Sequence, residues 1–178
     1  VIEPGIAGAA DFSVTYNAPI EMKSMNSELM VGLAITNIGS KITYTKSLTK
    51  DFLPANMGLG AAWNLDINDF NRITFAADVN KLLVPTPCQG QGCDTDGNGI
   101  PDFKEQSSIG AIFSSFGDAP EGFREEIREL TYSLGMEYWY DKQFAVRLGY
   151  YSEHFQKGGR KFLTAGLGLK YNVFGLNF

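Results

Sequence analysis

Carboxylate and amide side chains gather in one short stretch, CDTDGNGIPDFKE, which runs from Cys93 to Glu105. Their spacing matches the ligand pattern of a calcium loop without a mismatch, and Gly99 supplies the sharp turn that such a loop needs. Calcium is a hard cation that takes about six to eight oxygen ligands. The stretch therefore predicts a Ca²⁺ site with these ligands: Asp94, Asp96, Asn98, the backbone carbonyl of Ile100, Asp102 through a water, and Glu105.

The segment before this loop decides which kind of calcium site to expect. An EF-hand needs a helix on each side of its loop, but the prolines and glycines of LLVPTPCQGQG, residues 82–92, prevent a helix there. Pro101 inside the loop is also unusual for a calcium sensor. We therefore expect a structural ion rather than a signalling one. An acidic, glycine-rich surface loop that binds no metal is the alternative.

Cys88 and Cys93 are the two cysteines of the chain. Four residues lie between them, two of which are glycine, so a local disulfide is sterically plausible. Two free thiols or a metal-binding pair are the alternatives. A metal pair would need further Cys or His ligands, and the single histidine, His154, lies far along the chain. The disulfide indicates an oxidising compartment, where calcium at the modest affinity of extracellular modules also fits.

Most of the chain alternates large apolar residues with small or polar ones, which is the pattern of half-buried strands. The apolar face carries aromatic residues toward the strand ends, whereas the other face holds glycine, alanine, serine, threonine and isolated charges. The fold class is therefore all-β. The alternation predicts eight strands, around residues 12–16, 29–35, 57–67, 73–79, 132–140, 144–150, 163–171 and from 174 onward.

The connections between these strands decide between a soluble sandwich and a membrane barrel. They fall at residues 18–27 (medium), 39–55 (long), 68–70 (short), 81–130 (very long), 141–143 (short), 153–160 (medium-long) and 172–174 (short). Short turns on one rim and long extracellular loops on the other are typical of outer-membrane barrels, and a sandwich has no reason to sort its loops in this way. We expect a transmembrane antiparallel β-barrel of the outer membrane, with short helices in its long extracellular loop.

The second part of the long connection changes to a helical period. Ile109, Ile112, Phe113 and Phe116 fit one helical face, and residues 118–130 predict a short helix that Asp118 caps. An apolar, partly helical loop of this kind either packs on the rim of its own barrel or meets a partner. The sequence leaves both possibilities open.

One cross-strand pair follows from the hairpin whose turn we place at residues 141–143. With that turn, Tyr140 opposes Phe144, and Glu137 opposes Arg147 on the polar face. We expect the Glu137–Arg147 pair to be structural rather than catalytic.

Composition and missing motifs exclude several classes of function. The 178 residues carry a net charge of −5, which argues against nucleic acid as a partner. No apolar run approaches the length of a transmembrane helix. The start of the chain lacks the features of a signal peptide, and its abruptness favours a fragment of a longer protein. No nucleophile–base set, phosphate-binding loop or dinucleotide fingerprint is present, so we expect neither an enzyme nor an organic cofactor.

Several segments resemble the PorV family, the outer-membrane barrels of the type IX secretion system. The resemblance begins near Glu28 and runs over nearly all of the remaining chain, and its most specific parts are NKLLVPTP and KGGRKF…GLGLKYNVFGL. The family is similar in architecture to FadL-type fatty-acid transporters, with about fourteen strands, so the chain resembles the C-terminal half of a member. The insertion PCQGQGCDTDGNGIPDFKEQ departs from the family pattern. The other segments are NIGSKITYT, DFLPANMGLGAAWNL, SSFGDAPEGFREEIRELTYSLGMEYWY and FAVRLGYYSEHF.

The resemblance implies a non-enzymatic carrier in the outer membrane of a Gram-negative bacterium, with its long loops extracellular. Such a carrier works beside the large translocon barrel, binds the C-terminal signal domain of secreted cargo, and passes the cargo to the attachment complex with its sortase-like component. Outer-membrane lipid would surround it. We expect partner binding in the loop that starts at Lys81, above all at Phe113, Phe116 and Phe123.

Two other readings stay open at this level. The first is a FadL-like conduit for hydrophobic small molecules, which needs a continuous apolar path, whereas the residues of the polar face are small and polar. The second is a stand-alone eight-stranded barrel, which suits the length of the chain. A native polypeptide of about twice this length would remove the second reading.

Overall fold

The computed structural model describes residues 5–22, 25–43, 49–88 and 92–178. The chain divides into two compact units, which we treat separately. The loop unit comprises Val1–Ser13, Ala34–Met57 and Lys81–Glu129, and the sheet unit comprises Val14–Leu33, Gly58–Asn80 and Leu130–Phe178.

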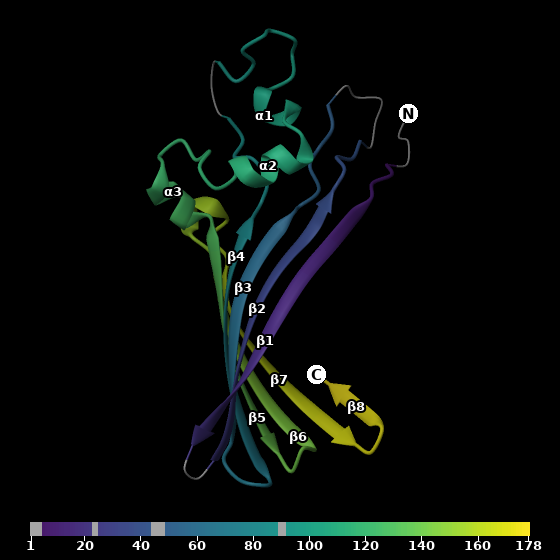
Figure 1. Ribbon diagram of the computed structural model, residues 1–178, viewed down its shortest axis with the longest axis vertical. Coiled ribbons are helices and arrows are strands. Elements are labelled where there is room, and N and C mark those ends of the chain that lie inside the picture. The colour runs from purple at the N-terminus through teal and green to yellow at the C-terminus, as the bar shows by residue number, and fades with distance from the viewer. Residues whose placement is uncertain (1–4, 23–24, 44–48, 89–91) are drawn as a thin grey trace. The chain divides into compact units, whose positions relative to one another are not determined.

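Eight strands form one sheet in which each strand neighbours the next in the chain, as Figure 1 shows. Within the described residues β1 and β8 are the outer strands, so the sheet is open. The all-β prediction is confirmed, closure into a barrel stays a prediction, and the reading in which these eight strands close on themselves gains no support. The strands are β1 (Ala9–Met22), β2 (Met25–Gly39), β3 (Asn56–Asp66), β4 (Asn71–Leu82), β5 (Leu130–Tyr140), β6 (Phe144–Ser152), β7 (Lys161–Tyr171) and β8 (Phe174–Asn177).

The first connection is shorter than the sequence suggested. We expected a medium link over residues 18–27, but β1 continues to Met22 and β2 begins at Met25; residues 23–24 lie outside the described part of the chain. Pro19 looks like a strand breaker, yet an outer strand tolerates proline because it needs no donor on its free side. Short and long connections now alternate along the whole chain.

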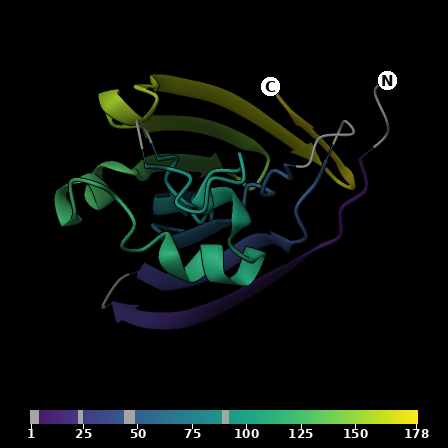
Figure 2. The same cartoon turned by 90° about the horizontal axis from the view of Figure 1, so that it is seen from above.

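The hairpin register predicted from the sequence is confirmed in the sheet unit. β5 and β6 pair antiparallel with Tyr140 opposite Phe144 and Glu137 opposite Arg147. β7 pairs with β6 along its length, and the two strands lie side by side in both views (Figure 1, Figure 2). The short strand β8 pairs with the end of β7. Because register fixes which side chains share a face, these pairings place Glu137, Arg147 and Lys170 on one side of the sheet.

The large apolar side chains of the sheet unit are not covered by protein. Leu134, Leu148, Leu163 and Leu167 all stay exposed, Leu163 at 82%. Within the described residues the buried apolar side chains are few and mostly small: Ala55, Leu83, Ala111, Ala119 and Ala145. A contiguous apolar surface of this kind marks a membrane or a protein interface rather than a face toward water.

Short helices occupy the connections. They are α1 (Asp102–Glu105), α2 (Ser108–Ser114), α3 (Phe123–Arg128) and the 3₁₀ turn η1 (Phe155–Lys157). The Ser107 side chain caps α2 by accepting a hydrogen bond from the Gly110 N–H at 3.0 Å. Among the described residues no helix is long and apolar enough to cross a membrane.

The predicted cap of the last helix is wrong. Gly122, with φ of 69°, is the N-cap of α3, and no side chain caps this helix. The Asp118 carboxylate instead accepts a hydrogen bond from the Thr86 N–H at 3.0 Å. Pro120 and Gly122 delay the helix past Asp118, so the carboxylate is free to bind the chain where the long connection begins.

A buried lysine joins the two ends of the long connection within the loop unit. Lys81 is 4% exposed, and its Nζ donates to Glu126 Oε2 and to Glu129 Oε2, each at 2.7 Å. The Thr86 hydroxyl lies 3.0 Å from Glu129 Oε1 and 3.1 Å from Asp118 Oδ1. One ammonium therefore compensates two carboxylates and anchors α3 beside the end of β4.

We expect Lys81→Met to destabilise the loop unit by about 3–5 kcal/mol, because it leaves two carboxylates without their buried cation. Urea-dependent protease cleavage of residues 81–129 measures the change. Lys104→Met is the matched control, since its ion pair with Asp51 is exposed and should contribute less than about 1 kcal/mol.

If Lys81→Met does not fold, the variant that also carries Glu126→Gln and Glu129→Gln should recover much of the loss, because no buried charge then remains unpaired. Equal stability of Lys81→Met and Lys104→Met would contradict the role of the buried cation.

A second ion pair fixes the connection between β6 and β7 in the sheet unit. Arg160 donates through Nε to Glu153 Oε2 at 2.9 Å and through Nη2 to Glu153 Oε1 at 3.1 Å. Gly158, with φ of 129°, has no room for a side chain, because a Cβ would collide with the Glu153 carboxylate. The Arg160 side chain holds the pKa of Glu153 below its ordinary value of 4.5.

This pair predicts a pH dependence with a defined sign. A carboxylate whose folded pKa is lowered stabilises the fold above its unfolded pKa and loses that effect as the pH falls through the folded value. The thermal midpoint of the native protein should therefore exceed that of Glu153→Gln by a constant amount above about pH 5. The difference should vanish in stronger acid. A difference that does not change with pH would exclude an ionic origin.

Candidate functional sites in the long connection and on the polar face

The first predicted ligand, Asp94, organises the acidic loop. Its Oδ1 accepts hydrogen bonds from the N–H groups of Gly97 at 2.8 Å and Asn98 at 3.1 Å, and its Oδ2 accepts one from Gly99 at 2.7 Å. Gly97 and Gly99 have φ of 72° and 83°, a left-handed conformation that favours glycine. The sequence GNG therefore folds the chain around one carboxylate.

The other predicted ligands converge on the same place. Asp94, Asp96 and Asp102 each have a carboxylate oxygen within 4.8 Å of the other two. The Asn98 amide donates to Asp96 Oδ2 at 2.9 Å and to Glu105 Oε1 at 2.8 Å, which brings the last predicted ligand to the cluster. The cluster offers a hard cation the oxygen ligands that it prefers.

Ile100 contributes its N–H to this loop, donating to Asn98 Oδ1 at 2.7 Å. Its carbonyl as a metal ligand stays a prediction. Asp102 lies at the start of α1 and accepts from the Thr95 hydroxyl at 2.6 Å and the Thr95 N–H at 3.0 Å.

Hydrogen bonds keep the cluster ionised. The N–H of Gly99 is the main cause that lowers the pKa of Asp94, and the Thr95 hydroxyl is the main cause that lowers the pKa of Asp102. Metal ligands must be deprotonated to bind. Both carboxylates are therefore in the form that a cation requires at neutral pH.

The predicted disulfide is confirmed. Cys88 and Cys93 are bonded, with their Cα atoms 5.6 Å apart, which excludes the free thiols and the metal pair. The intervening residues 89–91 lie outside the described part of the chain. The Cys93 carbonyl accepts a hydrogen bond from the Asp102 N–H at 2.7 Å. This hydrogen bond holds the start of the acidic loop next to α1, and the disulfide ties the same residue to Cys88.

Two lysines attach the end of the acidic loop to residues 40–55 of the same unit. Lys104, in α1, pairs through Nζ with Asp51 Oδ1 at 2.8 Å. The Lys41 Nζ donates to the Lys104 carbonyl at 2.6 Å and lies 4.4 Å from the centre of the Phe52 ring. Burial is the main cause that lowers the pKa of Lys41. The shape of the acidic loop therefore affects a second connection.

The three aromatic residues expected to bind a partner differ in their surroundings. Phe113 in α2 and Phe123 in α3 are 73% and 79% exposed, whereas Phe116 is 49% exposed, with its ring 6.0 Å from Lys81 Nζ. Phe113 and Phe123 are thus available to a partner, and Phe116 partly covers the buried ion cluster.

The polar face of the sheet unit carries interactions that the sequence reading mostly missed. Arg72 in β4 donates to both oxygens of Asp66 in β3, at 2.5 and 3.0 Å. The Thr74 hydroxyl donates to Asn64 Oδ1 at 2.7 Å. The sequence could have predicted these cross-strand pairs, because residues that flank a tight turn face each other across the hairpin.

The predicted Glu137–Arg147 pair is the centre of a second group on this face. Arg147 Nε donates to Glu137 Oε2 at 2.5 Å, and the Trp139 indole N–H donates to Glu137 Oε1 at 2.6 Å. Arg147 also reaches Asn177 of β8, at 2.7 Å. The pair predicted from one hairpin therefore connects three strands.

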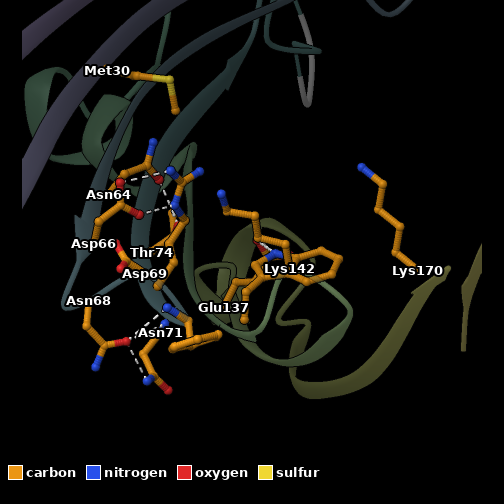
Figure 3. Close-up of a pocket in the computed structure, with 13 residues that line it drawn as sticks. Met30, Asn64, Asp66, Asn68, Asp69, Asn71, Thr74, Glu137, Lys142 and Lys170 are labelled. Atoms are coloured by element: carbon orange, nitrogen blue, oxygen red, sulfur yellow. Dashed lines mark hydrogen bonds and ion pairs between the residues drawn. The ribbon is translucent and has the colours of Figure 1, made fainter. Parts of the chain in front are cut away.

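These two groups border a cavity of about 450 Å³ that Figure 3 shows in close-up. Its walls come from β2, β3, β4, β5 and β7 and from the turns at residues 67–70 and 141–143. The two turns are joined, since the Asp141 N–H donates to the Phe70 carbonyl at 2.6 Å. No single stretch of sequence contains these residues, so no sequence motif predicts the cavity.

Comparison with known proteins relates the first half of the chain to a known family. A family model described as "Type IX secretion system protein PorV" matches residues 6–89, which include β1 to β4 and the start of the long connection. The match starts earlier than the resemblance seen in the sequence and ends before the acidic loop. A search of curated proteins gives no match. Residues 6–89, just under half of the chain, are therefore similar to the PorV family of type IX secretion system proteins.

Proposed function

We propose that this protein is a non-enzymatic outer-membrane carrier of the type IX secretion system. In this role it binds the C-terminal signal domain of a secreted cargo protein at the translocon and delivers it to the cell-surface attachment complex. The family match over residues 6–89 carries the proposal, because the family is a component of this secretion system.

The sheet supports an outer-membrane location. Its apolar side chains stay exposed while its backbone groups pair with neighbouring strands. Lipid suits such a surface, because it accepts apolar side chains and requires that backbone groups pair within the protein. Closure of the open sheet into a barrel would remove its unpaired edges.

The loop unit offers a surface for a protein partner. Residues 81–129 contain nine carboxylates and four cations, a net charge of −5 that equals the charge of the whole chain. Phe113 and Phe123 stand exposed within this acidic segment. Exposed aromatic anchors in a charged setting are typical of recognition sites that use charge to select a partner.

The polar face supports a carrier over a conduit for hydrophobic molecules. Asp66, Arg72, Glu137 and Arg147 form ion pairs across this face. A hydrophobic substrate that crossed the face would have to pass charged groups without replacing their interactions, which is unfavourable.

We also propose that the acidic loop binds a structural Ca²⁺, with Asp94, Asp96, Asn98, Asp102 and Glu105 as side-chain ligands. A divalent cation would relieve the repulsion among three converging carboxylates. The disulfide and the lysine contacts of α1 support a bracing role, because they attach both ends of the loop to neighbouring segments.

Gentle detergent extraction of the native protein, followed by mass spectrometry of co-purifying proteins, tests the carrier role. We expect a very large barrel and secreted proteins that share a C-terminal domain. The double variant Phe113→Ser and Phe123→Ser should reduce their recovery by about tenfold or more, since such anchors each contribute about 1–2 kcal/mol or more.

Phe155→Ser is the matched control, because Phe155 is equally exposed at 74% but lies in η1. It should leave recovery unchanged. A protein that co-purifies only with lipid or fatty acid would refute the carrier and favour the conduit. Recovery that falls equally in Phe155→Ser would refute the assigned surface.

Limited proteolysis tests the calcium proposal. Ca²⁺ should slow cleavage within residues 88–106 of the purified protein, and Mg²⁺ should have less effect because it demands a smaller, more regular ligand set. Asp94→Asn should weaken the Ca²⁺ effect on the order of tenfold or more, since a lost ligand charge lowers affinity.

Glu21→Gln, which removes an exposed carboxylate from β1, should behave as the native protein. Cleavage that does not depend on Ca²⁺, or that responds equally in Asp94→Asn, would leave the loop as an acidic surface loop without a metal.

A further inference from the structure

The cavity on the polar face has the size and composition of a ligand site. Its volume of about 450 Å³ lies within the range of about 300–1,000 Å³ that small-molecule sites occupy. A second cavity of about 640 Å³ shares five of its lining residues, among them Asp69 and Lys142, so the two adjoin. All these residues belong to the sheet unit, and the secretion role assigns them nothing.

Most of the charge that faces the cavity is already compensated. Asp66 has both oxygens bound by Arg72. Glu137 has one oxygen bound by Arg147 and the other by the Trp139 indole. Neither carboxylate is available to neutralise a further cation.

Two lysines remain. Lys142, in the turn between β5 and β6, and Lys170, near the end of β7, both line the cavity. Neither ammonium has a hydrogen bond or an ion pair within the described residues, and Figure 3 shows the Lys142 side chain between the Asn64–Asp66 side of the cavity and Lys170. Two ammonium groups without a hydrogen-bond or ion-pair partner in this part of the chain match a phosphate monoester, which carries nearly two negative charges at neutral pH.

The backbone at Lys142 points to a role for its side chain. Asp141 and Lys142 have φ of 52° and 54°, as in the two-residue turns where asparagine, aspartate and glycine are preferred. Aspartate adopts this conformation readily, but lysine does so at a steric cost. A side chain kept at an unfavourable position suggests that its ammonium is used.

The remaining polar groups of the cavity indicate which chemical groups the rest of the ligand carries. The Asn68 carbonyl oxygen is occupied by the N–H groups of Phe70 and Asn71, which leaves its amide to donate into the cavity. Asp69 supplies an acceptor, so the lining combines a donor and an acceptor with the two lysines. A hydroxyl group satisfies both, because it donates and accepts, whereas Asp69 would repel a second phosphate.

We propose that this cavity binds a small phosphate monoester with a hydroxyl-rich body, such as a sugar phosphate. Lys142 and Lys170 hold the phosphate, and Asn68 and Asp69 bind hydroxyl groups. A free sugar phosphate and the phosphorylated sugar headgroup of a lipid share this chemistry.

Tryptophan fluorescence can report the binding directly. The chain has two tryptophans, so Trp63→Phe leaves Trp139, in the cavity wall, as the sole reporter. The full chain in detergent, free of phosphate buffer, is titrated with glucose 6-phosphate, glucose and inorganic phosphate. We expect saturable binding of glucose 6-phosphate that exceeds the other two at least tenfold and weakens as salt is added.

Lys142→Asn with Lys170→Asn should weaken this binding by about tenfold or more, since each lysine loses a charge-assisted hydrogen bond. Asparagine tolerates the left-handed conformation at 142, so the thermal midpoint should not fall. Lys161→Asn, at the other end of β7, is the matched control and should bind as the native protein does.

A titration with detergent-solubilised lipid A distinguishes the two sources: tighter binding than glucose 6-phosphate supports a lipid headgroup, and weaker binding supports a free sugar phosphate. The proposal is overturned if glucose 6-phosphate gives no saturable response or if the asparagine variants bind it unchanged. Inorganic phosphate that binds equally well would overturn the assignment of the hydroxyl-rich body.

Discussion

The exposed apolar face of the sheet is the constraint on which the other features depend. Neighbouring strands pair along β5, β6 and β7, but many leucines and aromatics of these strands stay exposed. Water would disfavour such a surface by roughly 25 cal/mol per Å² of apolar area. The surroundings of the protein must supply what a hydrophobic core supplies elsewhere, and the proposed bilayer does so.

The same constraint explains how the loop unit is held together. With so few apolar side chains to bury, the long connection relies on specific polar links. Lys81 joins its two ends, the disulfide closes the approach to the acidic loop, and Asp94 organises the turn within it. Each link needs defined partners rather than apolar area, which suits a segment that keeps aromatic rings such as Phe113 exposed.

The two faces of the sheet unit have different roles. The apolar face meets the surroundings, whereas the polar face concentrates charge in pairs such as Asp66–Arg72 and Glu137–Arg147. Ion pairs at these positions stiffen neighbouring strands and limit which side chains can respond to a ligand. Lys142 and Lys170 stand out on this face because their ammonium groups have no hydrogen-bond or ion-pair partner within the described residues, and the proposed ligand rests on them.

Local patterns in the sequence determined the strands, the disulfide and one register. Alternation along each strand requires only neighbouring residues, five positions separate Cys88 from Cys93, and a three-residue turn aligns Glu137 with Arg147. Only the tertiary structure decided that β1 runs through Pro19, that Asp118 binds Thr86 instead of capping a helix, and that Lys81 meets Glu126 forty-five positions away. These long-range contacts depend on which distant segments become neighbours. The alternation of side chains along a strand carries no information about which segments those are. The cavity that Lys142 and Lys170 line is a long-range feature of this kind, since its walls exist only once five strands and two turns lie together.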